Sequence, residues 1–302
     1  MLWISLAVIA QILQAGGTYI DKYVLVVKNG INHPSAYAFF TAALSGVIVI
    51  ILPFGLVTWP TFEVAFLSLC SSMLYVASLL FLYRSIRKLS VTDVMPITAS
   101  TAAITVALLA SLWLAEDLPI SLLPAFALLV LGTFLIYCFC FPWSMFFMTV
   151  AAGVLGGAST FLLKIIFQTT TFGNALFWPL FMNVLVACIL LAPVRWKSIR
   201  DTMRDSSGGS KGLAIVSKSC AGIAFLFIFL AISLKGSSVT VINALNGLEL
   251  VFVLLFAYIF AHRIPHVFQA ETRRDTITLK VIGTIAIVVG LALLFVSGAT
   301  LT

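Results

Sequence analysis

The feature that most constrains this chain is a series of long apolar runs separated by short polar gaps. Apolar residues make up 62% of the sequence and charged residues only 9%, against roughly 25% charged residues in soluble domains. A helix crosses a bilayer in about 20 mostly apolar residues. Ten runs meet this requirement: 3–26, 36–55, 62–83, 92–114, 119–140, 146–168, 174–193, 213–234, 238–260 and 278–298. The sequence therefore predicts an all-α, polytopic membrane protein of about ten transmembrane helices.

The cations lie mostly in the gaps between these runs. The net charge of +7 does not indicate a nucleic-acid partner, because the Lys and Arg residues form no stripe interleaved with aromatic residues on a soluble segment. They concentrate in the first, third, seventh and ninth gaps. The positive-inside rule then places these gaps in the cytosol and both termini outside. We expect an integral protein of the plasma (inner) membrane.

Two segments call for a separate prediction. The longest gap, 194–212, is polar and rich in Ser and Gly, so it is predicted to be a mobile loop. The first apolar run has no basic segment before it and no small-residue cleavage motif after it. We therefore expect a retained span rather than a signal peptide.

Weak internal similarity divides the chain into two halves, 1–141 and 142–302. The matching pairs, in the same order in both halves, are Val8 with Val150, Thr18 with Thr160, Lys22 with Lys164, Pro119 with Pro265 and Gly132 with Gly290. Each half contains five predicted spans, and an odd number inserts the second half upside down relative to the first. This is the inverted-repeat plan of many secondary transporters, which bind the solute between the halves near the middle of the membrane.

Four segments resemble motifs of a known family. They are 19–25 (YIDKYVL), 90–97 (SVTDVMPI), 114–118 (LAEDL) and 241–247 (VINALNG). With them the chain resembles the drug/metabolite transporter superfamily, and specifically its EamA-like ten-span family, over nearly its whole length. Ala115 stands where Gly is usual in that family. The resemblance implies an electrochemically driven carrier of small metabolites or drugs, with a cavity lined by the first, third and fourth spans and their second-half equivalents. Many members keep both termini in the cytosol, whereas the charge pattern here predicts the opposite.

Glu249 is the best candidate for a functional group, because a charged side chain at membrane depth is costly and usually faces an interior cavity. Asn243 and Asn246 precede it at steps of three, so the three side chains share one face of a helix. Loss of water favours the neutral form of a carboxyl group, which allows it to take and release a proton. We expect Glu249, with Asn246 and Asn243, to bind a coupling proton or a cationic part of the solute. A structural hydrogen bond or ion pair is the alternative.

Lys22 and Lys164 occupy equivalent places near the ends of the first and sixth runs. An ammonium group there would neutralise an anionic solute or pair with Asp21 or Glu249. The alternative is that each long side chain extends to the lipid headgroups. Asp21 adjoins Lys22 but points about 100° away from it on a helix, so the two need not pair.

Hydroxyl groups follow the third and fourth runs. Ser71 and Tyr75 belong to a polar strip on the third, and Thr98 and Thr101 follow Pro96 on the fourth. Such groups serve either helix contacts or a wet cavity. Pro96 removes a helical hydrogen bond and can kink the helix, as a gate would require. Elsewhere, a Gly-x-x-x-Gly pair in the sixth run is typical of close helix packing, and a homodimer through it stays open.

No motif in the chain indicates an enzyme. The three His residues lack partners at zinc-ligand spacing, and neither a phosphate-binding Gly-rich loop nor a serine-hydrolase motif is present. We therefore expect no metal and no cofactor. The predicted function is secondary transport of a small-molecule solute. The alternatives are a membrane scaffold or sensor and, less favoured, an intramembrane lipid-modifying enzyme. The solute, the coupling ion and the direction of transport stay open.

Overall fold

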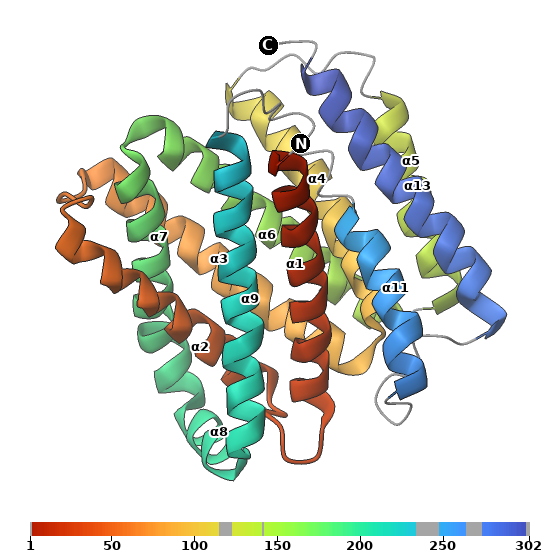
Figure 1. The fold of residues 1–302 in the computed structure, drawn as a ribbon, viewed down its shortest axis with the longest axis horizontal. Coiled ribbons are helices and arrows are strands. Elements are labelled where there is room, and N and C mark those ends of the chain that lie inside the picture. Colours follow the sequence, from red (N-terminus) through yellow and green to blue (C-terminus); the bar gives the residue numbers. More distant parts are fainter. Residues whose placement is uncertain (1, 115–122, 141, 234–247, 264–273, 300–302) are drawn as a thin grey trace.

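The fold is a bundle of helices, and Figure 1 shows most of them running side by side across the molecule. The computed structural model describes residues 2–114, 123–140, 142–233, 248–263 and 274–299. The first helices are α1 (Leu2–Val26), α2 (Pro34–Leu44), the 3₁₀ helix η1 (Ser45–Phe54), α3 (Phe62–Lys88), α4 (Val91–Leu114) and α5 (Leu123–Cys140). They are followed by α6 (Trp143–Thr169), α7 (Phe172–Val186), the π helix η3 (Ala187–Leu191), α8 (Ala192–Asp205), α9 (Gly208–Ser233), α11 (Leu248–Arg263) and α13 (Arg274–Ala299).

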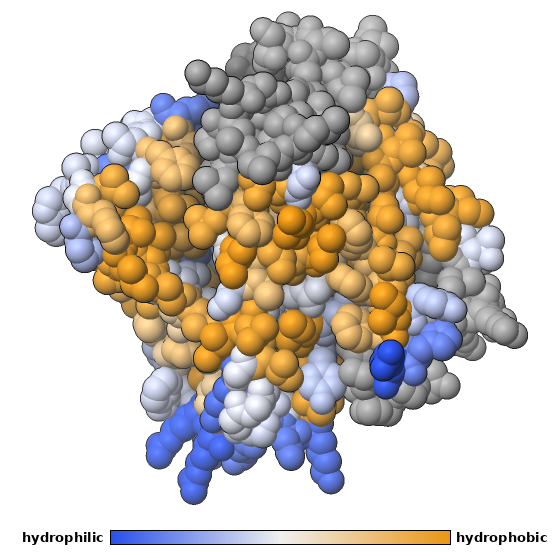
Figure 2. Space-filling model, in the orientation of Figure 1, coloured by the Kyte–Doolittle hydropathy of each residue, from blue (hydrophilic) through white to orange (hydrophobic). Residues whose placement is uncertain are grey.

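Among the described residues, six helical stretches are long and apolar enough to cross a bilayer. They are Pro34–Phe54, Phe62–Lys88, Val91–Trp113, Trp143–Thr169, Phe172–Leu191 and Gly208–Phe227. Large apolar side chains are exposed on their outer faces, such as Leu112 at 80% and Leu226 at 58%, and Figure 2 shows a broad hydrophobic surface across the middle of the molecule. Exposed apolar area on this scale needs hydrocarbon around it. The chain is therefore an all-α integral membrane protein.

Local signals set several of the helix ends. Thr61 caps α3 by accepting a hydrogen bond from the Val64 amide at 3.3 Å, with Glu63 in the first turn and Arg87 and Lys88 in the last. These charges suit the helix dipole at both ends. Pro34 opens α2, where a proline costs no hydrogen bond. Gly55 ends η1 in the left-handed region, with φ 67°.

The prediction of a mobile loop at 194–212 is wrong for most of that segment. Residues 192–205 form α8, which continues from α7 through η3, and α9 begins at Gly208. Ile199 and Met203 lie one turn apart on α8; Ile199 is buried, and both pack against the main apolar core. This contact stabilises an amphipathic helix. The many charges of the segment had favoured the prediction of a loop.

The described residues form several buried apolar clusters, and two of them are the largest. The larger cluster centres on three fully buried tyrosines, Tyr19 of α1, Tyr37 of α2 and Tyr83 of α3. The smaller joins α4, α5, α11 and α13 around Ile97, Leu129 and Ile287. Helices from the two ends of the sequence also pack together: α1 lies against α9 and α11, α3 against α6, and α5 against α13.

Candidate functional site

A buried ion pair joins α1 to α9. The Lys218 ammonium nitrogen Nζ lies 2.5 Å from Oδ2 of Asp21, and their side chains are only 17% and 10% exposed. Both residues lie inside helices of the bundle, several residues from the nearest helix end. A charged pair in such a place is rare in membrane proteins, and its members are usually functional.

Two further donors hold the Asp21 carboxylate. The Tyr37 hydroxyl donates to Oδ1 at 2.5 Å, and the Ser217 hydroxyl donates to the same oxygen. Ser217 also donates to the carbonyl of Gly17 at 3.0 Å, one turn earlier on α1. Three donors thus converge on one carboxylate and fix its position.

The Lys218 ammonium lies beside a pair of aromatic rings whose centroids are 4.7 Å apart. It lies 5.2 Å from the ring centroid of Tyr37 and 5.3 Å from that of Tyr83, within the range of a cation–π contact. It also donates to the Tyr83 hydroxyl at 3.0 Å, and that hydroxyl lies 3.1 Å from the Thr41 hydroxyl. We call Asp21, Tyr37, Thr41, Tyr83, Ser217 and Lys218 the Asp21–Lys218 cluster. It draws on α1, α2 and α3 on one side and on α9 on the other.

Lys22 has a different neighbourhood from the one expected. Its ammonium group donates to the carbonyls of Ile86 and Leu89 at 2.6 and 2.7 Å, at the C-terminal end of α3. Carbonyls at a helix end lack intrahelical partners and carry partial negative charge, so a cation stabilises them. Lys22 is itself buried and ties α1 to α3, whereas Lys164 lies exposed on α6. The structure does not bring these two lysines into equivalent surroundings.

The predicted hydroxyl groups lie mostly at contacts between helices. The Ser71 hydroxyl of α3 lies 3.0 Å from the hydroxyl of Ser159 on α6 and 3.1 Å from the Ser159 carbonyl, to which it donates. Tyr75 packs beside the main core. Thr98 and Thr101 donate to carbonyls one turn earlier on α4, each at 2.8 Å.

Pro96 lies buried in the second turn of α4, and the helix continues unbroken past it to Leu114. The Gly-x-x-x-Gly pair of the sixth run, Gly153 and Gly157, faces α4. Their added Cβ atoms would come within 2.7 Å of the Thr98 carbonyl and 2.6 Å of the Ala102 carbonyl. This glycine pair therefore serves packing inside the chain.

Glu249 lies in the first turn of α11 and is half-buried. Its neighbour Leu250 packs in the smaller core against Ile97. Asn243 and Asn246, the other two members of the predicted polar run, fall outside the described residues. The role expected for the three together stays a prediction.

Lys218 is the functional candidate that sequence reasoning missed. It is a single cation within the eighth apolar run, and a charged residue inside a span is the signal that singled out Glu249. The charge argument for orientation used only the cations in the gaps, so it did not consider Lys218. Asp21 was recognised, but its partner lies 197 residues away, a separation that no local pattern reveals.

The described residues hold no group of three or more His, Cys, Asp or Glu side chains that could bind a metal ion.

A second set of charged groups lies at the end of the bundle that carries α8. His33 precedes α2, and its ring nitrogen Nδ1 is 2.7 Å from the Ser35 hydroxyl. Burial lowers the pKa of His33, and the guanidinium groups of Arg195, Arg87 and Arg84 lower it further. The positive charges of three arginines from α3 and α8 therefore act on one imidazole.

This arrangement predicts a loss of stability in mild acid. Because the folded protein binds a proton at His33 less tightly than the unfolded chain does, this contribution is complete above the ordinary pKa of 6.5 and declines as the pH falls below it. We expect the unfolding temperature of the purified protein to fall between pH 7 and pH 5.5. The fall should shrink in His33→Asn but not in His262→Asn, an exposed control. Equal slopes in both variants would contradict the assignment to His33.

Comparison with family models and with curated proteins finds no match. Among solved structures, the chain is similar to one described only as the crystal structure of a protein, with a TM-score of 0.59 and 15% identity. The match covers 98% of this chain and 97% of that one. At this identity the likeness concerns the fold alone, and it extends over the whole bundle.

Proposed function

We propose that this protein is a secondary transporter that moves a small solute across a bilayer with ten spans arranged as two inverted five-helix units. The observation that carries the proposal is the Asp21–Lys218 pair, because it joins a helix of the first half to a helix of the second inside the bundle. Solute sites of inverted-repeat transporters lie between the two repeats. A structural scaffold has no need of two opposite charges there, since apolar contacts join helices at lower cost.

The pairing of the helices supports the inverted halves. If the spans of the halves correspond in order, α1 matches α6, α3 matches α9, and α5 matches α13. The packing of α1 on α9 then corresponds to that of α6 on α3, and the α5–α13 contact corresponds to itself. Gly132 of α5 lies against the Gly283 carbonyl, and Gly290 of α13 lies against the Ala125 carbonyl. These are the two glycines that the internal similarity aligned.

The ion pair also suggests how solute binding and opening are coupled. Separating α1 from α9 requires Asp21 and Lys218 to part, and an unpaired charge at this depth is unfavourable. A solute that offers a carboxylate or phosphate to Lys218, or a proton that neutralises Asp21, lowers this barrier. We therefore favour a solute with an anionic group, with proton coupling at Asp21. Two further hydrogen bonds join the halves near this contact. Ser206, just after α8, and Ser210, in the first turn of α9, donate to the carbonyls of Gly30 and Asn29, each at 3.1 Å.

The test begins with a thermal-shift screen of the purified protein against small carboxylates, phosphates, sugars and amines. Solutes that raise the unfolding temperature are then assayed for uptake into proteoliposomes with an imposed pH gradient. We expect uptake of an anionic solute that depends on the gradient. Lys218→Gln should lower the rate at least about tenfold, the factor that corresponds to a lost contact of about 1.4 kcal/mol. Lys211→Gln, on the first turn of the same helix, should transport at the wild-type rate.

Two results would count against transport through this site. One is a folded Lys218→Gln protein that takes up the solute as fast as the wild type. The other is a wild-type protein that neither binds nor takes up any member of the panel under either direction of the gradient.

A further inference from the structure

Ser217 of α9 faces two oxygen acceptors on α1 at once. Its hydroxyl oxygen lies 3.0 Å from the Gly17 carbonyl oxygen, and it is also within hydrogen-bond distance of Oδ1 of Asp21. Gly17 and Asp21 are about one helical turn apart, so both acceptors lie on the same side of α1. Ser217 is 1% exposed. A serine hydroxyl carries one proton, so it donates to only one of these two acceptors at a time.

Glycine at position 17 allows this close contact between α1 and α9. A Cβ atom added to Gly17 would lie 3.3 Å from the Ser217 carbonyl oxygen and 3.5 Å from its hydroxyl oxygen. The nearer of these atoms belongs to the backbone, so a longer side chain at position 17 would push the helices apart. The two helices are therefore held close at the level where the serine meets the carboxylate.

The two positions of the Ser217 proton suit the two forms of Asp21. When Asp21 is ionised, Ser217 and Tyr37 donate to Oδ1, and Lys218 donates to Oδ2. When Asp21 is protonated on Oδ1, its new O–H group needs an acceptor. Ser217 provides one by turning its own proton to the Gly17 carbonyl, whose oxygen has a second lone pair beside its helical hydrogen bond. Both forms are then hydrogen-bonded with the heavy atoms in the same places.

We propose that Ser217 is a positioning residue for proton coupling, because it lets Asp21 gain and lose a proton without leaving a buried polar group unpaired. A buried donor without an acceptor bears the full cost of losing its water. The reorientation of one hydroxyl group removes this cost from the protonation of Asp21. This role rests on the transport function proposed above and on proton coupling at Asp21.

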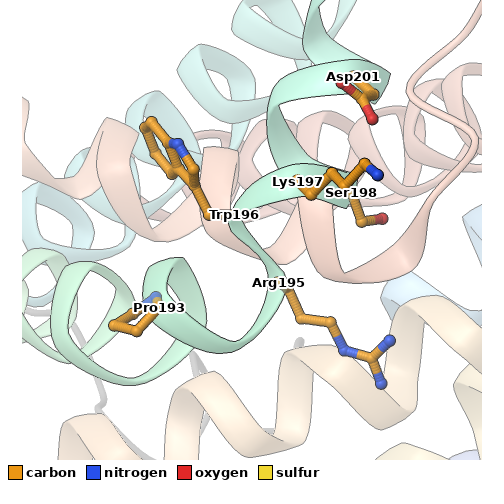
Figure 3. Close-up of a pocket in the computed structure, with 6 residues that line it drawn as sticks. All are labelled: Pro193, Arg195, Trp196, Lys197, Ser198 and Asp201. Carbon is orange, nitrogen blue, oxygen red and sulfur yellow. The ribbon is translucent and has the colours of Figure 1, made fainter.

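Water approaches Asp21 most closely from the end of the bundle that carries α8. Asp21 lies five residues before the end of α1 at Val26, about 8 Å along the helix axis. Hydrophilic side chains gather at this end, along the lower edge of the molecule in Figure 2, where Figure 1 shows α8. A shallow hollow at the first turn of α8 is lined by polar groups that include Arg195, Ser198 and Asp201 (Figure 3). We therefore expect the coupling proton to come from this side.

Other titratable groups on the helices around α1 have to be separated from Asp21. They are Tyr37 of α2, Tyr75 and Tyr83 of α3, Asp93 of α4, Lys218 of α9 and Glu249 of α11. Asp21→Asn keeps all of them and places at position 21 a neutral amide that resembles a protonated carboxyl group. The Lys218 ammonium can only donate, so it binds the amide oxygen and leaves the amide NH2 group facing Ser217.

The first experiment measures the unfolding temperature of the full-length protein in detergent for Ser217→Ala in two backgrounds. In Asp21→Asn, the amide NH2 group loses its acceptor, whereas Asp21→Ala has no polar side-chain atom to lose one. We expect Ser217→Ala to lower the unfolding temperature by at least about 2 °C more in the first background than in the second. Ser217→Thr keeps the hydroxyl group and should keep the stability of Asp21→Asn. Equal losses in the two backgrounds would overturn the proposal.

Ser78→Ala is the matched control. Ser78 of α3 is a buried serine that donates to the Ala152 carbonyl of α6 at 2.7 Å, so its removal costs one hydroxyl–carbonyl bond away from Asp21. In the Asp21→Asn background it should lower the unfolding temperature less than Ser217→Ala does. This comparison takes the place of the first if Asp21→Ala does not fold, and a loss as large in Ser78→Ala would contradict the proposal.

The second experiment measures uptake into proteoliposomes with and without an imposed proton gradient. The probe is the small carboxylate or phosphate that raises the unfolding temperature of the wild type most. Ser217→Ala should reduce the gradient-dependent part of uptake at least about tenfold, while Ser217→Thr and Ser78→Ala keep it. Unchanged gradient dependence in Ser217→Ala would overturn the role of Ser217 and leave transport standing. A wild type that takes up no member of the panel would overturn the proposed function, and the unfolding temperatures test the bond to Ser217 independently of that result.

Discussion

Lys218→Met should destabilise the protein by about 3–5 kcal/mol, because it leaves the Asp21 carboxylate buried without its partner. The loss exceeds that of an ordinary surface substitution, which is usually within about 0.5 kcal/mol. Tyr37 and Ser217 would still donate to Asp21, but they supply no positive charge. The measurement is the free energy of unfolding in detergent, or the unfolding temperature where unfolding is irreversible.

A double variant separates the cost of an unpaired charge from loss of packing. Asp21→Asn/Lys218→Met removes both charges and keeps a donor and acceptor at position 21, so it should recover most of the stability lost in the single variant. Lys211→Met, in the first turn of α9, is the control for removing a lysine. The single variant Asp21→Asn completes the comparison. If the double variant loses as much stability as Lys218→Met and Asp21→Asn lose together, the two charges do not stabilise each other.

Gly157→Val should disrupt the contact between α4 and α6. A Cβ atom at this position would lie 2.6 Å from the Ala102 carbonyl oxygen and 3.0 Å from the Ala102 Cα atom. Both are backbone atoms, so relief requires the helices to move apart rather than a side chain to turn. Overpacking of this kind costs about 1–3 kcal/mol or more. The checks are the unfolding temperature and the yield of monodisperse protein.

The chain offers a control with the same chemical change. Gly222, in the middle of α9, is exposed, and nothing lies within 4 Å of an added Cβ atom. Gly222→Val should leave the unfolding temperature nearly unchanged, since a helix gains propensity when glycine is replaced by most other residues. A comparable loss in both variants would mean that the effect comes from a valine in a membrane helix and not from the α4–α6 contact.

The apolar runs predicted the membrane class and most of the helix positions, because the length of a span is set by the bilayer and the run is visible residue by residue. α3 begins at Phe62 and α4 at Val91, both within a residue of the predicted starts. The helix α8 was missed because its charges and the following Ser and Gly residues resemble a loop. Its apolar spacing, Ile199 with Met203, indicates a helix once charge is set aside.

The candidate site was only partly predictable. Asp21 was predicted as a possible ion-pair partner of Lys22 or Lys164, and its separation in direction from Lys22 follows from helix geometry. The partner of each residue depends on which helices meet: Lys22 reaches the end of α3, and Asp21 meets Lys218 across a contact between two distant segments. Such pairings follow from tertiary packing. A rule that examines every charge inside a run would have found Lys218.

The distance along the chain between Asp21 and Lys218 has a consequence for biogenesis. At synthesis rates of about 5–20 residues per second, the ribosome needs roughly 10–40 s to make the 197 residues that separate them. During that interval α1 has left the ribosome while the lysine that neutralises it does not yet exist. We therefore expect the first helix to insert with Asp21 protonated or within reach of water, and to gain its lysine partner only when α9 arrives.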